Sequence, residues 1–191
     1  MPWEKAYREE EVLEAAMRAF WARGYEATSI AELVKVTGIN RGSLYAAFDD
    51  KRGLFLRVLA HYDVHHRAGF LKEIARSSAP RAAILEVFRR AAAQSGDLPR
   101  GCLLVNTALE VAPHDSEIAD LVNKRLRAVE DFFCKQIKAG RKAGSLRADL
   151  APRRTAQGLL GLFLGLRVLC RTDPQNVEAQ AILSHAKRML R

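Results

Sequence analysis

Residues 28–51, TSIAELVKVTGINRGSLYAAFDDK, are the stretch around which the rest of the chain is organised. Ser29 followed by Glu32 matches a capping box, in which a hydroxyl and a carboxylate pair with N–H groups at a helix start. Gly38 marks the end of that helix, because glycine takes the left-handed conformation without a Cβ clash. Asn40 is a favourable N-cap for a second helix. Two short helices joined by a glycine-containing turn predict a helix-turn-helix.

The first turn of the second helix, Arg41-Gly42-Ser43, is suited to DNA contact. A helix that enters the major groove uses its N-terminal residues on base edges, and its dipole favours phosphate. Gly42 costs about 1 kcal/mol of helix propensity relative to alanine, which makes sense where another backbone must come close. Tyr45 would lie beside this edge with a hydroxyl available for a phosphate. The alternative is an ordinary helical corner in an all-α domain, because such patterns also arise by chance.

This stretch resembles the N-terminal domain of the TetR family of bacterial repressors, the TetR/AcrR group, in register from about Val12 to Leu59. The matching residues are Ala19, Phe20, Gly24, Tyr25, Thr28, Ser29, Ile30, Ala31, Gly38, Ile39, Asn40, Arg41, Gly42, Ser43, Leu44, Tyr45, Phe48, Lys51 and Leu54. Val36-Thr37 and Ala47 depart from the pattern, and Ala47 removes a possible contact to the DNA backbone. The resemblance implies a homodimer on a roughly palindromic operator. It also implies a divergent C-terminal domain that dimerises and usually holds a small-molecule inducer.

The predicted DNA contacts divide into two groups. Phosphates would be held by Thr28, Ser29, Tyr45 and Lys51, and bases would face Arg41, Gly42 and Ser43 behind the Asn40 cap. Arg41 is the best candidate for guanine recognition, worth about 1–3 kcal/mol if bidentate. Cations outnumber acids in residues 35–57, whereas residues 1–62 as a whole are close to neutral. The DNA footprint should therefore be small and nonspecific affinity modest.

Length and composition indicate a globular protein. The chain has 191 residues, 49% of them hydrophobic and 28% charged, with a net charge of +9; these are ordinary globular values. No apolar run is long enough to span a membrane, and no signal-peptide pattern is present. The cysteines, Cys102, Cys134 and Cys170, have no metal-like spacing and fit a reducing compartment. We therefore expect a cytoplasmic protein.

Hydrophobic periodicity predicts an all-α fold of about nine helices. Residues 1–60 would form a three-helix helix-turn-helix domain, and residues 61–191 a C-terminal regulatory and dimerisation domain. One long helix, from the Asp49-Asp50 cap past Tyr62 to about Arg76, would join the two and turn as a rigid rod. Further helices are expected at about 4–23, 81–95, 100–113, 115–143, 153–171 and 174–190.

Histidines on the long helix raise the question of a metal. His61 and His65 are four residues apart, a spacing that can bind a transition metal. Although Asp63 is close in sequence, no carboxylate or cysteine nearby completes a ligand set. We therefore expect a solvated or hydrogen-bonded histidine cluster and no metal site; a metal or ligand role for these histidines is the alternative. No cofactor is expected beyond an unknown small-molecule inducer.

The segment 101–110, GCLLVNTALE, resembles a subset of the family with a G-C-L-x-x-N segment opening this helix. Cys102 would lie in the first turn, where the helix dipole favours a thiolate. It is therefore either a redox- or electrophile-sensing thiol or a small packing residue. Asn106 and Glu110, four apart on an apolar helix, must find polar partners. They either pair with a neighbouring helix or line the polar end of an inducer pocket. His66 is a further candidate for a ligand-binding or sensor residue in this pocket.

The helix at 153–171 is apolar nearly all round, so it must be covered on all sides in a soluble protein. Glycines on one edge, including Gly165, would let another backbone come close. Together with the helix at 174–190, doubled by a two-fold axis, it would form a four-helix interface. The predicted interface residues are Leu162, Gly165, Leu169, Ala181, Ile182 and Met189.

These features predict a transcriptional repressor that a small-molecule or electrophile/redox signal releases from double-stranded operator DNA. The alternative is a thiol-based enzyme or ligand-binding protein that uses Cys102 with His66 or His114. No triad spacing or phosphate-binding loop supports an enzyme, so we expect no catalytic residues.

Overall fold

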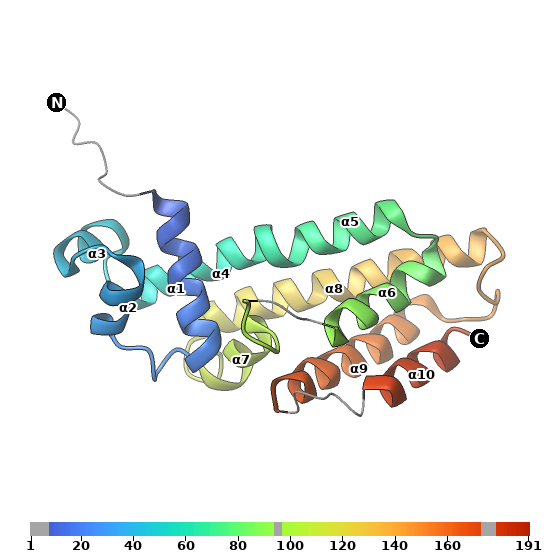
Figure 1. Ribbon diagram of the computed structural model, residues 1–191. Coiled ribbons are helices and arrows are strands. Elements are labelled where there is room, and N and C mark those ends of the chain that lie inside the picture. The colour runs from blue at the N-terminus through green and yellow to red at the C-terminus, as the bar shows by residue number, and fades with distance from the viewer. Residues whose placement is uncertain (1–7, 94–96, 173–178) are drawn as a thin grey trace.

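The computed structural model describes residues 8–93, 97–172 and 179–191. Within these ranges the chain forms ten α-helices and one π-helical segment, and no strand (Figure 1). Because α4, the π segment and α5 run on as one rod, this amounts to the nine helices predicted, and the all-α fold is confirmed. None of the described helices combines the length and apolar character needed to cross a membrane.

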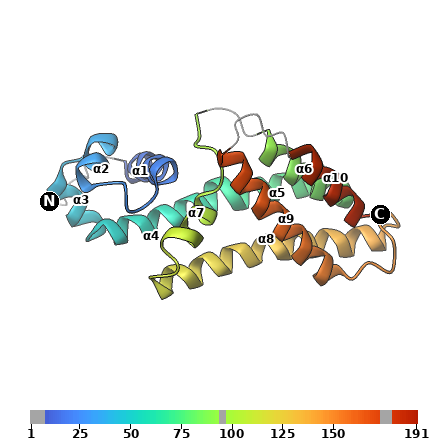
Figure 2. The ribbon, with the colours of Figure 1, turned by 90° about the horizontal axis from the view of Figure 1, so that it is seen from below.

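The N-terminal unit consists of three helices gathered at one end of the molecule (Figures 1 and 2). They are α1 (Glu9–Arg23), α2 (Ile30–Thr37) and α3 (Arg41–Phe48). Their shared core is built on Phe20, Leu33, Leu44 and Phe48, all buried. The predicted start of the first helix, at residue 4, lies outside the described residues.

The predicted caps form at both helix starts. The Ser29 hydroxyl accepts a hydrogen bond from the Glu32 N–H at 3.1 Å, and the Asn40 side chain accepts one from the Ser43 N–H at 2.8 Å. Gly38 takes the left-handed conformation at φ 72°. One half of the capping box is wrong: the Glu32 carboxylate pairs with the guanidinium of Arg23 at 2.8 Å instead of reaching back.

The long rod that leaves the N-terminal unit is not a uniform α-helix. It consists of α4 (Lys51–Tyr62), a π-helical segment (Asp63–Ala68) and α5 (Gly69–Ser77). The prediction of one continuous helix is therefore corrected at its middle turn. A π segment bonds residues five apart, so it shifts side chains around the helix axis, and such segments are frequent at functional sites. The buried Asp63 carboxylate, which pairs with Arg67 and with Arg125 at 3.0 Å, lies in this segment.

The C-terminal unit packs around a second core. Its helices are α6 (Pro80–Ala92), α7 (Leu103–Glu110), α8 (Ser116–Lys142), α9 (Pro152–Thr172) and α10 (Ala179–Met189). Figure 2 shows α9 crossing between α8 and α6, with α10 at the end farthest from the N-terminal unit. The predicted starts and ends agree to within a few residues, except that the predicted end at residue 95 and the predicted start at residue 174 lie outside the described residues.

Packing continues across the predicted domain boundary at residue 60. The core that holds α1–α4 also includes Leu103, Leu104 and Val105 of α7 and Ile118 and Val122 of α8. The N-terminal unit therefore packs directly on α7 and the start of α8. A displacement of α7 would change the packing of the N-terminal unit.

Candidate DNA-binding surface and sensor cavity

The first turn of α3 forms an exposed polar edge. Arg41 and Gly42 are exposed, and Ser43 is half-buried. The Arg41 guanidinium donates a hydrogen bond to the Tyr45 hydroxyl at 3.2 Å and lies 5.5 Å from the centre of its ring. A cation and a phenol are therefore held side by side on the outer face of α3.

Gly42 is not required by the fold. A methyl group at this position would come within 3.4 Å of the Asn40 side-chain oxygen and would meet no other neighbour within 4 Å. Gly53, in contrast, allows α4 to approach the Phe48 carbonyl oxygen, which an added Cβ would meet at 2.1 Å. The bare backbone at Gly42 therefore leaves space on the outside of the molecule rather than within it.

The predicted phosphate contacts separate into exposed and buried residues. Lys51 sits at the start of α4, with its ammonium 4.4 Å above the Tyr25 ring and 3.4 Å from the Glu26 carbonyl oxygen. Ser29 is exposed at its cap position. Thr28 is fully buried and its hydroxyl donates to the Gly24 carbonyl at 2.6 Å, so its assignment as a phosphate contact is corrected. This hydroxyl instead braces the turn between α1 and α2.

Asn106 and Glu110 do not belong to the lining of the cavity described below, which corrects their assignment to its polar end. The Glu110 carboxylate accepts hydrogen bonds from the Tyr25 and Glu26 N–H groups at 2.9 and 2.8 Å. The Asn106 amide donates to the Trp21 carbonyl at 3.4 Å. Both side chains thus bind free backbone groups at the end of α1, which is the neighbouring-helix alternative.

Two further contacts hold the N-terminal unit on the C-terminal unit. Arg171 of α9 donates to the carbonyl of Trp21 at 2.9 Å and to that of Ala22 at 3.1 Å. Arg52 of α4 binds Asp115 at 2.6 Å and Glu117 at 2.7 Å at the start of α8. The Arg52 side chain, helped by the Ile118 N–H, lowers the pKa of Asp115 to about 2.

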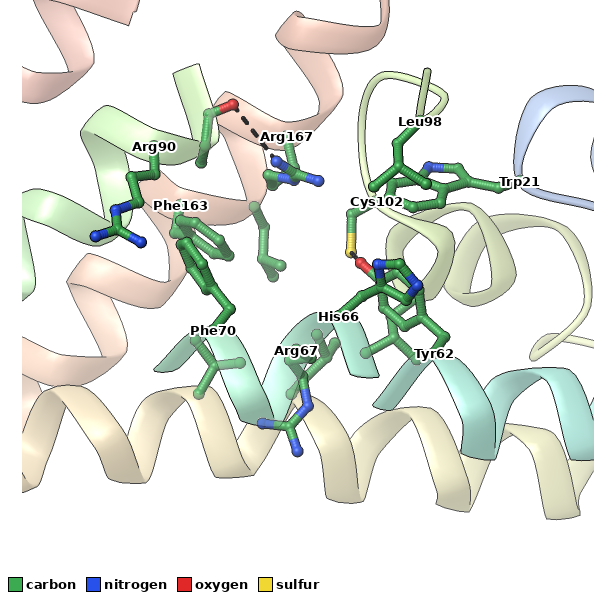
Figure 3. Close-up of a pocket in the computed structure, with 15 residues that line it drawn as sticks. Trp21, Tyr62, His66, Arg67, Phe70, Arg90, Leu98, Cys102, Phe163 and Arg167 are labelled. Atoms are coloured by element: carbon green, nitrogen blue, oxygen red, sulfur yellow. Dashed lines mark hydrogen bonds between the residues drawn. The ribbon is translucent and has the colours of Figure 1, made fainter. Parts of the chain in front are cut away.

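A cavity of about 180 Å³ lies where α1, α4, the π segment, α7, α8 and α9 meet (Figure 3). Figure 3 shows Trp21, Tyr62, His66 and Cys102 grouped on one side, and Phe70, Phe163 and Arg90 on the other. Its lining residues are Trp21, Tyr62, His66, Arg67, Phe70, Arg90, Ala91, Leu98, Cys102, Leu104, Leu126, Val129, Phe163, Leu164 and Arg167. The wall is therefore largely aromatic and aliphatic, with a few cationic groups.

Cys102 lies at the N-cap of α7, one residue before the helical turn predicted for it. Its Sγ is 3.4 Å from the Tyr62 hydroxyl. Burial, and then the neighbouring Cys102, raise the pKa of Tyr62 well above its ordinary value, so this phenol stays protonated. Cys102 and His66 both line the cavity, which brings together two of the four predicted sensor residues.

The cavity has polar groups that sequence patterns did not reveal. The Trp21 indole Nε1 is buried and has no hydrogen-bond partner among the described residues. Arg167 is buried and donates to the Gly101 carbonyl and, at 3.4 Å, to the Ala91 carbonyl. The apolar run of α9 gives no sign that Arg167 faces inward, because helical periodicity cannot distinguish a core face from a cavity wall.

The predicted dimer residues lie on α9 and α10, where Leu162, Ile182 and Met189 also pack against the core of their own chain. Gly165 and Ala181 are exposed, and the remaining four predicted interface residues are half-buried. A Cβ on Gly165 would meet nothing within 4 Å, so this backbone is open. Gly158 differs from Gly165, because a Cβ there would come within 2.5 Å of the Met189 methyl of the same chain. Part of α9 is thus exposed and apolar, including Val168 at 41% exposure.

Two family models match the chain. The model described as "Bacterial regulatory proteins, tetR family" matches residues 12–58, and "Tetracyclin repressor-like, C-terminal domain" matches residues 78–186. The chain belongs to the TetR family. Members of this TetR family are transcriptional regulators, and the predicted membership is confirmed.

Curated relatives of this TetR-family chain are transcriptional repressors. The HTH-type transcriptional repressor ComR of Escherichia coli is 34% identical over 148 residues, covering 71% of this chain and 68% of ComR. The repressor NemR of Escherichia coli is 25% identical over 174 residues, covering 88% of this chain and 86% of NemR. The chain is therefore a DNA-binding transcriptional regulator.

Solved structures share the whole fold. A cysteine-substituted form of the TetR family transcriptional regulator CifR, complexed with 26-base-pair operator DNA, superposes with a TM-score of 0.83 at 30% identity, covering 98% of this chain and 97% of CifR. The reduced form of Escherichia coli NemR gives a TM-score of 0.83 at 24% identity, covering 95% and 96% of the two chains. The latter likeness concerns the fold alone.

Proposed function

We propose that this chain is a repressor that binds a roughly palindromic operator as a homodimer and releases it when a small molecule or an electrophile acts at the Cys102 cavity. The observation that carries the proposal is the position of the cavity. It touches α1 and α4 of the DNA-binding side through Trp21 and Tyr62, and α7 through Cys102. A molecule bound there must alter contacts between the two units or be excluded.

On DNA, the exposed edge of α3 would enter the major groove. Arg41, Gly42 and Ser43 would face base edges, and Ser29, Tyr45 and Lys51 would hold phosphates on either side. Two such edges related by a two-fold axis would lie about 34–36 Å apart, one turn of the duplex. In the DNA-binding homodimer, the two chains would contact each other through the exposed faces of α9 and α10. Since its ligand is chromosomal DNA, we expect the protein in the cytoplasm.

The cavity favours a small, mainly apolar signal molecule with one polar acceptor group. A cavity of about 150 Å³ accommodates benzene, so the 180 Å³ found here suits a ligand of similar or slightly larger size. The unpaired Trp21 Nε1 and the buried guanidinium of Arg167 would bind a carbonyl or carboxylate oxygen. An activated alkene with a carbonyl group has this chemistry. Its addition to Cys102 would form one S–C bond and place the thiol proton on the neighbouring carbon, so no further reactant is needed.

The signal can reach the DNA-binding edge through α7. Cys102 caps the start of this helix, and Glu110 at its end holds the turn after α1. A bulky adduct on Cys102 would displace α7 or Tyr62 and so shift the angle between the two units. A ligand changes DNA affinity only if it binds the two arrangements with different affinity, and a bulky group in a small cavity meets this condition.

The thiol-enzyme alternative gains no support from the geometry. The Cys102 Sγ lies 3.4 Å from the Tyr62 hydroxyl, which burial keeps protonated and which is therefore no base. The Nε2 of His66 faces the Glu14 carboxylate at 3.2 Å. Neither group is arranged to take a proton from the thiol.

Operator binding after thiol modification tests the proposal. DNA fragments retained by the protein would be sequenced to define an operator, and its affinity measured by fluorescence anisotropy before and after treatment with N-ethylmaleimide. We expect N-ethylmaleimide to lower the operator affinity of the wild type by at least about tenfold, equal to about 1.4 kcal/mol, and to leave the affinity of Cys102→Ala unchanged. Cys134→Ala, which removes a buried thiol in the other core, is the matched control and should behave as the wild type. Equal loss in Cys102→Ala and the wild type would contradict the proposal.

A further inference from the structure

Three ligand-type side chains converge at the joint between α1 and the long rod. The Nε2 atoms of His61 and His66 lie 3.1 and 3.2 Å from the same Glu14 oxygen, Oε2. All three ligand atoms lie within 4.8 Å of one another. His61 is buried, and Glu14 and His66 are half-buried. The site opens on a groove lined by residues of α1 and the rod.

The π segment creates this arrangement. Residues five apart lie on different faces of an α-helix but share a face where the backbone winds as a π-helix. His61 at the end of α4 and His66 within the π segment are five apart, so the π turn aligns both rings with α1. The sequence pattern singled out His61 with His65 instead, since it assumed α-helical spacing throughout.

The distances fit a coordination polyhedron. Zinc binds imidazole nitrogen at about 2.0–2.1 Å and carboxylate oxygen at about 2.0–2.2 Å, so ligand atoms around a tetrahedral ion lie about 3.4 Å apart. Two edges of 3.1 and 3.2 Å are therefore close to the required size. Two histidines and one carboxylate, with an open side for water, are also a donor set that transition metals accept.

Neighbouring residues hold the Glu14 carboxylate in position. The other Glu14 oxygen, Oε1, accepts from Arg18 at 3.0 Å, and Arg18 is itself anchored on the Asp97 carbonyl at 3.2 Å. Hydrogen-bonded ligand carboxylates of this kind are usual in metal sites. Outside the cluster, the carboxylate of Glu10 lies 3.9 Å from the third imidazole, His65.

The geometry points to a site for a divalent transition-metal ion of the zinc type, bound by Glu14 Oε2, His61 Nε2 and His66 Nε2 with water completing the shell. The ion would join α1 of the N-terminal unit to the rod. His66 also lines the Cys102 cavity and stacks on Tyr62 with ring centres 5.8 Å apart. Metal binding would thus fix one wall of the cavity. The expectation of no metal site is replaced by this proposal, because Glu14 lies 47 residues before His61 and sequence spacing could not pair them.

Calorimetric titration of the tag-free, chelator-treated full-length protein with zinc chloride tests the site. We expect one ion per chain for the wild type, and an affinity lower by at least about tenfold for Glu14→Gln and His66→Gln, since each removes a ligand. His65→Gln is the matched control, because it removes a neighbouring imidazole that faces Glu10 rather than Glu14. It should bind zinc within about threefold of the wild type, as should Cys102→Ala.

Nitrogen NMR of the wild-type imidazoles gives a measurement that needs no variant. Of the five histidines in the chain, zinc should move the Nε2 signals of His61 and His66. Circular dichroism without metal would show whether each variant is folded. If a variant is unfolded, the NMR titration of the wild-type protein tests the site in its place. The proposal is overturned if zinc does not bind, if all variants bind it equally, or if the responding rings are His65, His114 or His185.

Discussion

The Glu110 carboxylate in α7 accepts a hydrogen bond from the Tyr25 N–H at the end of α1, at 2.9 Å, although the residues are 85 positions apart. Its second oxygen accepts from the Glu26 N–H at 2.8 Å. Gly24 makes this approach possible, because a Cβ there would come within 2.7 Å of the carboxylate. A side chain of the C-terminal unit therefore caps the turn that leads into the helix-turn-helix.

Glu110→Ala should destabilise the protein by about 1–2 kcal/mol, since it leaves two N–H groups without a charged acceptor. Urea unfolding measures the change. Leu109→Ala is the matched control, because Leu109, next to Glu110 on the same helix, is 72% exposed, so this substitution should change stability by less than about 0.5 kcal/mol. Equal unfolding midpoints for the two variants would show that the Glu110 contacts do not matter.

Gly42→Ala should fold normally yet bind operator poorly. The added methyl has space in the free protein and improves helix propensity by up to about 1 kcal/mol, but it would occupy the gap proposed for DNA. We expect a thermal midpoint at or above that of the wild type, with affinity at least about tenfold weaker by anisotropy. Gly53→Ala should instead lower the midpoint, because its methyl would clash with the Phe48 carbonyl. Unchanged operator affinity in Gly42→Ala would contradict the proposed docking.

Arg41→Ala should relax operator specificity at one base pair of each half-site, losing about 1–3 kcal/mol there. Binding to a panel of half-site variants measures this. Tyr45→Phe keeps the arginine and removes the hydroxyl that it contacts, so it should weaken binding similarly across the panel. If Arg41→Ala preserved the wild-type ranking of half-sites, Arg41 would not be the residue that reads bases.

The Arg52–Asp115 pair should make stability depend on acid pH. Because the folded pKa of Asp115 is about 2, below its ordinary 3.8, the pair stabilises the fold above about pH 4, and this contribution is lost as the pH falls towards about 2. Asp115→Asn keeps an N-cap acceptor for Ile118 but not the charge. We expect the wild type to exceed Asp115→Asn in urea midpoint at neutral pH, and this difference to shrink between pH 4 and 2. A constant difference would exclude the ion pair as its cause.

Gly165→Glu should convert the protein to a monomer if α9 forms the dimer interface. A side chain there meets nothing within 4 Å in its own chain, so the variant should keep its circular dichroism spectrum. Light scattering after size exclusion measures the mass. Leu109→Glu, which places the same charge on an exposed site of α7, should leave the wild-type mass unchanged. A Gly165→Glu protein that kept the mass of a dimer would move the interface elsewhere.

Local rules predicted much of this protein. The caps at Ser29 and Asn40 and the left-handed turn at Gly38 depend on atoms within a few residues of one another, so their patterns are visible in the sequence. The helix boundaries, the family membership and the place of Cys102 follow from similar short-range signals. Thr28 shows the limit, because the same motif position is compatible with an outward or an inward hydroxyl, and only the folded structure shows that it is buried and donates to the Gly24 carbonyl.

The sequence by itself determined the helix-turn-helix, the all-α architecture and the type of protein, because capping, helical periodicity and motif spacing act over a few residues. The tertiary structure alone decided that Glu110 caps a turn 85 residues earlier in the chain, that Trp21 and Arg167 line a cavity, and that Glu14 meets two histidines. These contacts depend on how helices cross and, at His66, on a π turn. No periodic pattern specifies either, since both arise from packing between segments far apart in the chain.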